Sequence, residues 1–345
     1  MSLFDANLLK GRRSVTIDGI DFNIISANDK DFFNEVYYKE DHSKLTWENT
    51  FVYLYSASSV SSEKKKMFLW KNIRGYLYVF TYNPIVHRLE VHTLPVKIED
   101  ELSNFNKSHI EELVDIMNTI NNKSKSFVGG TTKEYLEGNF DLSCPTFKYF
   151  YDGSYDDFVY DVDEIIELKG KKFENRRNMI RRFHRDYPNA VFRKYDPIKD
   201  KSCIYKLRDK WISHKSATGT KSIWDKSIMK FLFENIDFLG IYVYVMEIDG
   251  SIEGFTISGK FCDNCSILVS LNTNFEIKGL AEAIWYETLK ATRSLGKYTN
   301  IGSGGKPTHG LYKYKKSFNP IVMIEKPSLL LNKDGNYICN IDKGV

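Results

Sequence analysis

The same order of secondary-structure elements is predicted twice along this chain of 345 residues. In the first half, alternating apolar and polar residues predict three consecutive strands, at 67–71, 75–82 and 88–94. Helical spacing of apolar residues over 108–121 predicts a helix, and a strand at 126–129, a short helix and a strand at 146–151 follow. This order, β-β-β-α-β-α-β, is typical of a mixed sheet flanked by helices.

The second half repeats this order. Strands are expected at 241–248 and 252–260, joined at Asp249-Gly250, a dipeptide that favours a tight hairpin, and a third strand is expected at 266–271. A helix over 280–295 follows, and then a strand at 298–301, a short helix at 309–316 and a last strand at 318–325. We therefore expect two α/β (α+β) domains of one topology.

The domain boundary is expected in the acidic, glycine-containing segment 152–165, which has few apolar residues. We expect a first domain at 1–151, a second at 152–330 and a tail at 331–345. Buried or basic helices at about 45–55, 163–187 and 201–213 precede the two sheets. With 42% hydrophobic residues, the chain can form two cores.

Cysteine usage and hydropathy exclude several classes of protein. Cys144, Cys203 and Cys339 stand alone, which argues against a disulfide framework. The spacing of Cys262 and Cys265 is that of a zinc site, but two further ligands are lacking nearby, so no metal is expected. No leader and no apolar run of about 20 residues is evident, which predicts a soluble, cytoplasmic protein without an integral membrane segment.

The turn before the main helix of the second half is the clearest candidate for a phosphate-binding loop. Acetyltransferases of the GNAT type have Gln/Arg-x-x-Gly-x-Gly/Ala here, and Glu276-x-x-Gly279-x-Ala281 resembles it. Small residues allow backbone N–H groups to approach a phosphate at a helix N-terminus. The predicted donor-binding residues are Glu276, Lys278, Gly279, Leu280 and Ala281. The alternative is a glycine-containing loop that only begins a helix.

The first half has no such turn. Its third strand leads into the acidic segment 93–101, which contains no glycine and disfavours an anion. The first domain is therefore expected to be structural or to shape an acceptor groove.

Two further segments resemble one family. Leu168-Lys169-Gly170-Lys171-Lys172, with Arg176-Arg177-Asn178, Phe183 and Tyr187-Pro188, is similar to a signature of proteins related to the C-terminal domain of phosphatidylglycerol lysyltransferases. The segment from Gly310 to Pro320 is similar to a second element of that family, and the segment 43–47 resembles the family more weakly. The likeness covers most of 160–325 and implies two tandem GNAT-like domains. Where the family has an acidic segment before Gly310, this sequence has the glycine-rich run 300–306.

The first of these segments is also a basic helix. Eight cations between 169 and 185 face one acid, Glu174, while Phe173, Ile180, Phe183 and Tyr187 can face a core. The predicted polyanion-binding residues are Lys171, Lys172, Arg176, Arg177, Arg181 and Arg182. The alternative is a solvated helix face.

The resemblance implies an acyl- or aminoacyl-transferase that moves a group from a coenzyme A thioester or an aminoacyl-tRNA to an amine or hydroxyl by direct attack. The candidate catalytic residues are Lys315, His309 and Tyr312, with Gly304 and Gly305 beside the donor. The competing hypothesis is a non-catalytic module that binds RNA or another polyanion. The sequence does not distinguish the two donors and does not identify the acceptor, the general base or the oligomeric state.

Overall fold

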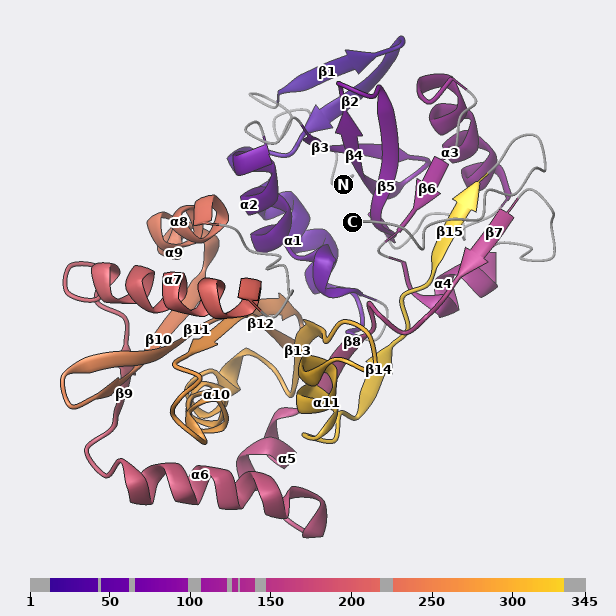
Figure 1. The fold of residues 1–345 in the computed structure, drawn as a ribbon. Coiled ribbons are helices and arrows are strands. Elements are labelled where there is room, and N and C mark those ends of the chain that lie inside the picture. The colour runs from indigo at the N-terminus through magenta and orange to yellow at the C-terminus, as the bar shows by residue number, and fades with distance from the viewer. Residues whose placement is uncertain are drawn as a thin grey trace. The chain divides into compact units, whose positions relative to one another are not determined.

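The computed structural model describes residues 13–42, 45–61, 66–98, 107–122, 126–129, 131–139, 147–217 and 226–331. The chain divides into two compact units (Figure 1). Unit 1 comprises Met1–Tyr155 and Ile324–Val345, and unit 2 comprises Asp156–Met323. The returning C-terminal segment thus belongs to unit 1, whereas the sequence placed everything up to residue 330 in the second domain.

Unit 1 is built on a sheet whose strands lie in the order β1-β2-β3-β4-β5-β6-β15-β7. Its strands are β1 (Ser14–Ile17), β2 (Ile20–Ile24), β3 (Met67–Ile73), β4 (Tyr76–Asn83), β5 (Arg88–Lys97), β6 (Ser126–Val128), β7 (Phe147–Phe150) and β15 (Ser328–Leu331). Neighbouring strands are antiparallel except β5 and β6, which pair in parallel. The helix α3 (Lys107–Ile120) lies between these two strands in the chain. β15 pairs with both β6 and β7, which fixes the C-terminal segment in this unit.

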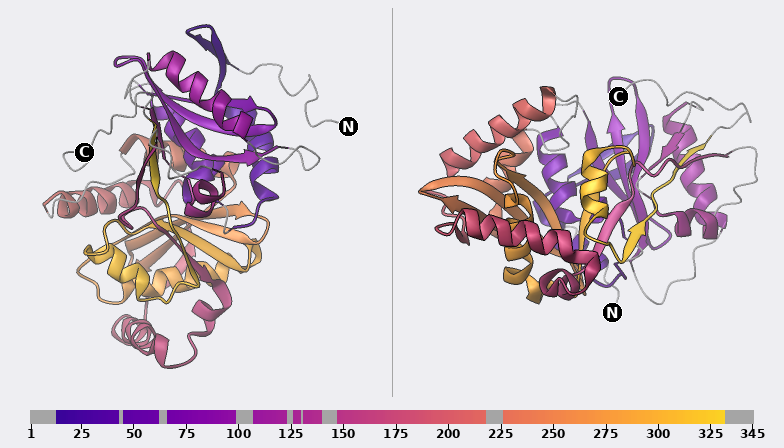
Figure 2. Two further views of the ribbon diagram at one scale, coloured as in Figure 1. Left: turned by 90° about the vertical axis from the view of Figure 1, so that its right-hand side faces the viewer. Right: turned by 60° about the horizontal axis from the view of Figure 1, so that its bottom comes forward.

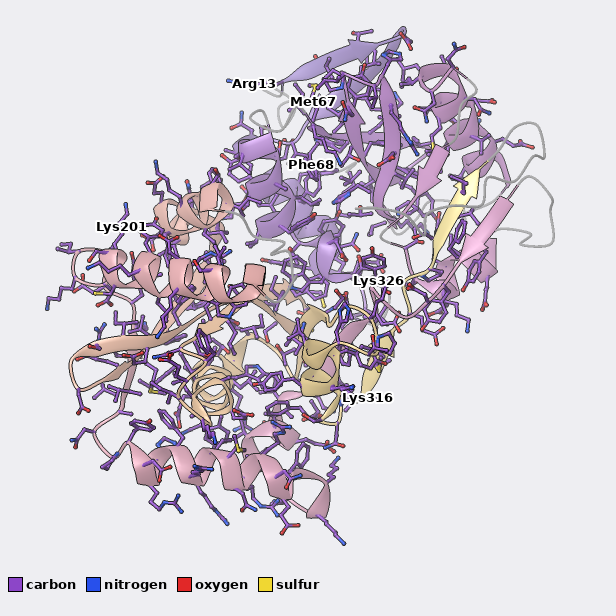
Figure 3. The ribbon with its side chains drawn as sticks, viewed as in Figure 1. Arg13, Met67, Phe68, Lys201, Lys316 and Lys326 are labelled. Atoms are coloured by element: carbon purple, nitrogen blue, oxygen red, sulfur yellow. The ribbon has the colours of Figure 1, made fainter. Side chains whose placement is uncertain are left out.

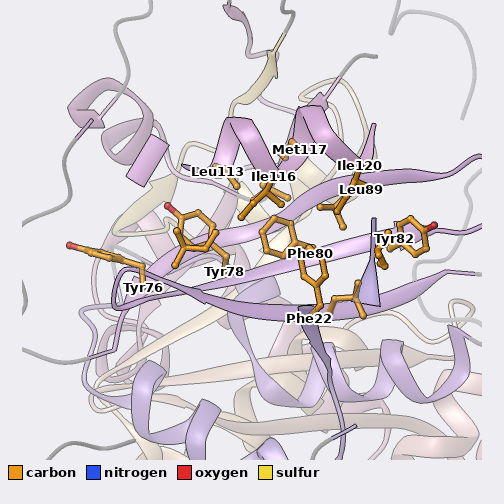
Figure 4. Close-up of a cluster of buried hydrophobic side chains, with 14 of the residues drawn as sticks. Phe22, Tyr76, Tyr78, Phe80, Tyr82, Leu89, Leu113, Ile116, Met117 and Ile120 are labelled. Atoms are coloured by element: carbon orange, nitrogen blue, oxygen red, sulfur yellow. The ribbon is translucent and has the colours of Figure 1, made fainter. Parts of the chain in front are cut away.

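Side chains that alternate along the strands fill two layers of core in unit 1. Figure 4 shows Phe80 and Tyr78 of β4 against Leu113, Ile116, Met117 and Ile120 of α3. The other face of the sheet is covered by α1 (Lys30–Tyr38) and α2 (Phe51–Ser61), where Trp70 of β3 lies with its ring centroid 5.0 Å from that of Phe32. Leu69 and Trp70 point to opposite layers because neighbouring strand residues face opposite sides.

Unit 2 contains a second sheet, in the order β14-β8-β13-β12-β11-β10-β9. Its strands are β8 (Asp157–Asp161), β9 (Val191–Lys194), β10 (Ile241–Ile248), β11 (Ser251–Cys262), β12 (Cys265–Thr273), β13 (Tyr298–Ser303) and β14 (Val322–Ile324). α7 (Lys201–Ala217) and α8 (Lys226–Glu234) cover one face, while α10 (Leu280–Ala291) covers the other, with α6 (Glu174–Asp186) packed outside it (Figures 1 and 2).

β12 and β13 are parallel but pair over only three residues each. The pairs are Cys265 with Tyr298, Ser266 with Thr299, and Ile267 with Asn300. Beyond Ile267 and Asn300, which both lie in a fully described stretch, the two strands are no longer joined, and the pairing of β13 with β8 is also irregular between Asn300 and Ser303. The sheet therefore opens into a gap at the carboxyl ends of β12 and β13.

The expected mixed sheets flanked by helices are confirmed, and the three-strand meander of each half lies within two residues of its predicted start. The predicted helix over 280–295 is shorter, because α10 ends at Ala291 and a 3-10 turn follows at Arg293–Leu295. The sequence missed the edge strands β1 and β9 and the interior strands β2, β8 and β15. The predicted strand at 318–325 is shorter, because β14 covers only Val322–Ile324. Several residues discussed from the sequence lie outside the described residues: the acidic stretch 99–101, the tail from 332 onward, Ser43, Lys44, Cys144 and Cys339.

Candidate transfer site

The turn that leads into α10 has the left-handed glycine expected of it, but α6 covers that glycine. Gly279 has φ +84°, and a Cβ placed on it would lie 2.6 Å from the carbonyl oxygen of Met179 and 3.1 Å from Cβ of Phe183. Leu280 is fully buried beneath α6 and Ala281 is half-buried. The small residue is required by the approach of α6, so the expectation that Gly279 leaves room for a phosphate needs correction.

Two carboxylates lie near this helix N-terminus, and each is paired with a cation. Glu282 lies in the first turn of α10, is 6% exposed, and its Oε1 accepts a hydrogen bond of 2.7 Å from Arg176 Nη1. Glu276, in the preceding turn, forms an exposed ion pair of 2.9 Å with Lys210 of α7, and Lys278 is exposed. The Glu282 carboxylate is favoured by the positive end of the α10 dipole and by the Arg176 guanidinium.

Arg176 is therefore not part of the outer surface of α6, which corrects the sequence-based expectation. Its side chain is 16% exposed, and its guanidinium lies 4.6 Å from the ring centroid of Phe318 and 5.5 Å from that of Tyr314. Arg177 also points inward, donating to the carbonyl oxygens of Leu168 and Gly170 in the link between α5 (Val162–Glu167) and α6.

The remaining cations of the basic segment are exposed. Lys172 pairs with Glu164 at 2.7 Å, and Arg182 pairs with Asp186 at 3.2 Å. Lys171 and Arg181 form no ion pair with any residue that the structure describes. The predicted apolar face is confirmed, since Phe173, Ile180 and Phe183 are buried.

Lys315, on α11 (Gly310–Lys316), binds the end of β13. Its Nζ donates to the carbonyl oxygens of Ile301 at 2.5 Å, Gly302 at 3.1 Å and Ser303 at 2.7 Å. An ammonium group has three N–H donors, so these contacts use all of them in this state. Tyr160 of β8 fixes the same helix by donating to the Lys315 carbonyl oxygen at 2.8 Å. The adjacent Lys316 is exposed (Figure 3).

The other candidates near α11 differ in exposure. Gly304 allows close packing, because a Cβ there would lie 2.6 Å from Cα of Tyr312. Tyr312 is 9% exposed and packs edge-on against Phe158. His309 is exposed and precedes α11, and Gly305, at φ +74°, lies directly beside its ring. The structure thus brings Gly304, Tyr312 and Lys315 together and leaves His309 on the surface.

The sequence missed a set of buried polar side chains at the gap between β12 and β13. On the β12 side, Asn272 accepts 2.9 Å from Arg208 Nη1 of α7 and donates 2.6 Å to Ser270 Oγ. On the β13 side, Asn300 donates to Asp157 at 3.3 Å and accepts from the Gly302 N–H at 2.8 Å. All of these side chains are less than a tenth exposed. Of these residues, Ser270 and Asn300 lie inside predicted strands, where a polar residue is the sequence signal.

The model of the phosphatidylglycerol lysyltransferase C-terminal family matches residues 143–326, which include all of this site. The chain belongs to this family. No curated protein matches it. Among the residues that the structure describes, no helix is long and apolar enough to span a membrane.

Solved structures share the fold of this chain. A conserved protein of unknown function from Bacteroides thetaiotaomicron is 21% identical with a TM-score of 0.74, over 90% of this chain and 99% of that one. The C-terminal domain of a putative lysylphosphatidylglycerol synthetase from Agrobacterium fabrum has a TM-score of 0.60 at 13% identity. The match covers 89% of this chain and 92% of that domain. FemX has a TM-score of 0.59 at 10% identity, and the match covers 88% of this chain and 96% of FemX. Family and fold together support an acyl- or aminoacyl-transferase.

Proposed function

We propose that this protein is an aminoacyltransferase that takes its aminoacyl group from an aminoacyl-tRNA and transfers it at the gap between β12 and β13. The observation that carries the choice of donor is the packing of α6 over the N-terminus of α10. A coenzyme A pyrophosphate would need free backbone N–H groups and positive potential there. Instead, α6 packs on Gly279 and the Glu282 carboxylate lies in the first helical turn.

The exposed cations of α6 support a polynucleotide donor. Arg181 and Arg182 are exposed on α6, and Lys171 is exposed in the 3-10 turn Lys171–Phe173 that precedes this helix, so all three can contact a phosphate backbone. Arg176 and Arg177 are excluded from this surface because their guanidinium groups are bound inside unit 2.

The gap supplies the positioning that direct transfer requires. The pairing of β12 with β13 ends at Ile267 and Asn300, and we place the extended aminoacyl arm where the two strands diverge. The acceptor amine or hydroxyl attacks the ester carbonyl carbon, and the bond from that carbon to the tRNA ribose oxygen breaks. The proton lost by the nucleophile is taken up by the released ribose oxygen. Lys315 holds the β13 side of the gap.

The deciding experiment compares the two donor classes directly. The purified protein is mixed with tRNA charged with labelled amino acids, or with coenzyme A and acetyl-coenzyme A, and binding and release of the label are measured. We expect charged tRNA to bind and to lose its aminoacyl group to an added amine or hydroxyl acceptor, while coenzyme A leaves the melting temperature unchanged. Saturable binding of coenzyme A that competes with charged tRNA would overturn the proposal.

A second candidate function rests on the same basic face: a module that binds RNA without catalysis. It predicts equal affinity for charged and uncharged tRNA and no loss of the aminoacyl group beyond spontaneous hydrolysis.

A further inference from the structure

Arg176 joins three helices of unit 2 at one buried point. From α6 its guanidinium donates to Glu282 of α10 at 2.7 Å and to Ser317 Oγ, which caps α11, at 2.5 Å. The side chains of Arg176 and Glu282 are 16% and 7% exposed. A planar guanidinium is suited to this arrangement because it can donate in two directions while stacking on a ring, here that of Phe318.

The contacts continue from Arg176 to the gap. Ser317 Oγ donates in turn to the carbonyl oxygen of Tyr314 at 2.5 Å, which holds the last turn of α11. That turn carries Lys315, whose ammonium binds the carbonyl oxygens of 301–303, where β13 has left β12. A displacement of α11 would therefore move the β13 side of the gap.

We infer that Arg176 is a positioning residue: by holding α11 against α6 and α10, it sets the separation of β12 and β13 in which the donor arm lies. The inference rests on the proposed transfer at this gap, and it gives this member of the basic segment a role different from that of its exposed neighbours. Arg176 acts through Ser317 and Lys315 and touches neither the donor nor the acceptor.

The test is a comparison of Arg176→Lys with Arg181→Gln. Arg176→Lys keeps the charge but lacks the planar fork, so it cannot bind Glu282 and Ser317 together and stack on Phe318. We expect its kcat to fall by about tenfold to a hundredfold, the effect of misplacing a reacting group by about 1 Å. Its affinity for charged tRNA should stay within about twofold of wild type, whereas Arg181→Gln should weaken that affinity.

A readout independent of catalysis separates this inference from the proposed function. Hydrogen exchange measured by mass spectrometry should accelerate at least about tenfold in α11 and at 301–303 in Arg176→Lys, with β10 unchanged. Ser317→Ala removes one contact and leaves the Arg176–Glu282 ion pair, so it should fold and show a smaller change of the same kind. If the wild type transfers nothing, the proposed function fails and the exchange data still decide the role of Arg176.

Either of two results would overturn the inference. One is a kcat of Arg176→Lys equal to that of wild type at a temperature where both are folded. The other is an unchanged exchange rate in α11 in both Arg176→Lys and Ser317→Ala.

Discussion

Two glycines of unit 2, Gly279 and Gly170, both have positive φ angles but differ in ψ and in their surroundings. Gly279 is left-handed, with φ +84° and ψ −6°, whereas Gly170 has φ +82° and ψ 173°, and an L-residue is strained in both regions. A Cβ on Gly170 would meet no atom within 4 Å, whereas a Cβ on Gly279 would collide with the backbone of α6. Gly170 therefore carries conformational strain without close packing, and Gly279 carries both.

We expect Gly170→Ala to lower the free energy of unfolding by about 1–3 kcal/mol, the cost of a backbone conformation that is essentially restricted to glycine. Gly279→Ala should lower it by about 2–5 kcal/mol, because overpacking against α6 adds about 1–3 kcal/mol to the cost of about 1–2 kcal/mol for the left-handed conformation. Urea unfolding of the two variants measures both effects. A loss of no more than about 1–2 kcal/mol in Gly279→Ala would show that α6 moves away from Gly279 at no cost. Any loss of donor binding in Gly279→Ala has to be compared with this loss of stability.

Lys315 and Lys316 are a second matched pair of residues. Lys315 is tied to three backbone carbonyl groups, and its neighbour is exposed with its Nζ 5.8 Å from the ring centroid of Tyr312. We expect Lys315→Met to lower the turnover of aminoacyl transfer by at least about tenfold and to destabilise unit 2 by about 1–3 kcal/mol, since buried carbonyl groups lose their donor. Lys316→Met should change neither by a measurable amount. Steady-state kinetics with thermal unfolding checks the pair.

At the scale of elements, α6 has one buried and one exposed face. The inner face packs Phe183 and Arg176 against α10, and the outer face exposes Arg181 and Arg182, with Lys171 exposed in the 3-10 turn that precedes the helix. Amphipathic helices with this division are stabilised by the inner face alone, so substitutions on the outer face are tolerated in folding.

The triple variant Lys171→Gln, Arg181→Gln, Arg182→Gln should bind tRNA more weakly while its melting temperature stays within about 2 °C of wild type. The slope of log affinity against log salt should decrease by about 2–3, because up to three phosphate contacts are lost. The control removes the same charge elsewhere in unit 2, at Lys194, Lys206 and Lys230, which are also exposed. If the control weakens binding equally, net charge and not the face of α6 attracts the tRNA.

At the scale of the whole molecule, the two units are sensitive to acid in different pH ranges. In unit 1, burial lowers the pKa of His92 to about 4, although the Glu48 carboxylate opposes this shift. In unit 2, hydrogen bonds from Arg193 lower the pKa of Asp200 below its ordinary value of 3.8, and its two oxygens accept from Arg193 at 2.6 and 2.9 Å. These shifts act on different groups, a neutral imidazole and a charged carboxylate.

Unit 1 should lose stability as the pH falls from 6.5 towards 4, because the unfolded chain binds a proton at His92 that the folded unit does not. The loss is at most about 1.4 kcal/mol per pH unit. Hydrogen exchange of β4, followed by mass spectrometry from pH 7 to 4.5, should show this slope in wild type. In His92→Gln the slope should be smaller, and an unchanged slope would assign it to other groups.

Unit 2 should keep the stability contributed by Asp200 between pH 6.5 and pH 4. It should lose this contribution only below pH 3.8, as the carboxylate is protonated in the folded state. Exchange of β10, which pairs with β9 beside Arg193, reports on this loss. Asp200→Asn should be less stable than wild type at pH 7 and should lack the additional loss below pH 3.8. A steep loss in Asp200→Asn at low pH would contradict this assignment.

The sequence determined the features that depend on neighbours along the chain. The repeated order of strands and helices, the hairpin at Asp249-Gly250, the left-handed glycine at 279 and the apolar face of α6 all follow from local periodicity and backbone preferences. Short edge strands such as β9 were missed, because four residues are too few for a pattern to emerge and their pairing is decided by β10.

Only the tertiary structure decided what each charged residue contacts. Arg176 and Arg181 lie five positions apart on one helix and look alike in sequence, yet one is buried against Glu282 and the other is exposed. Likewise, Lys315 binds the end of β13, and Gly279 packs against α6, which is distant along the chain. A helical pattern fixes which residues share a face, but the partners of that face come from folding, since burial and hydrogen-bond geometry depend on atoms far away in sequence.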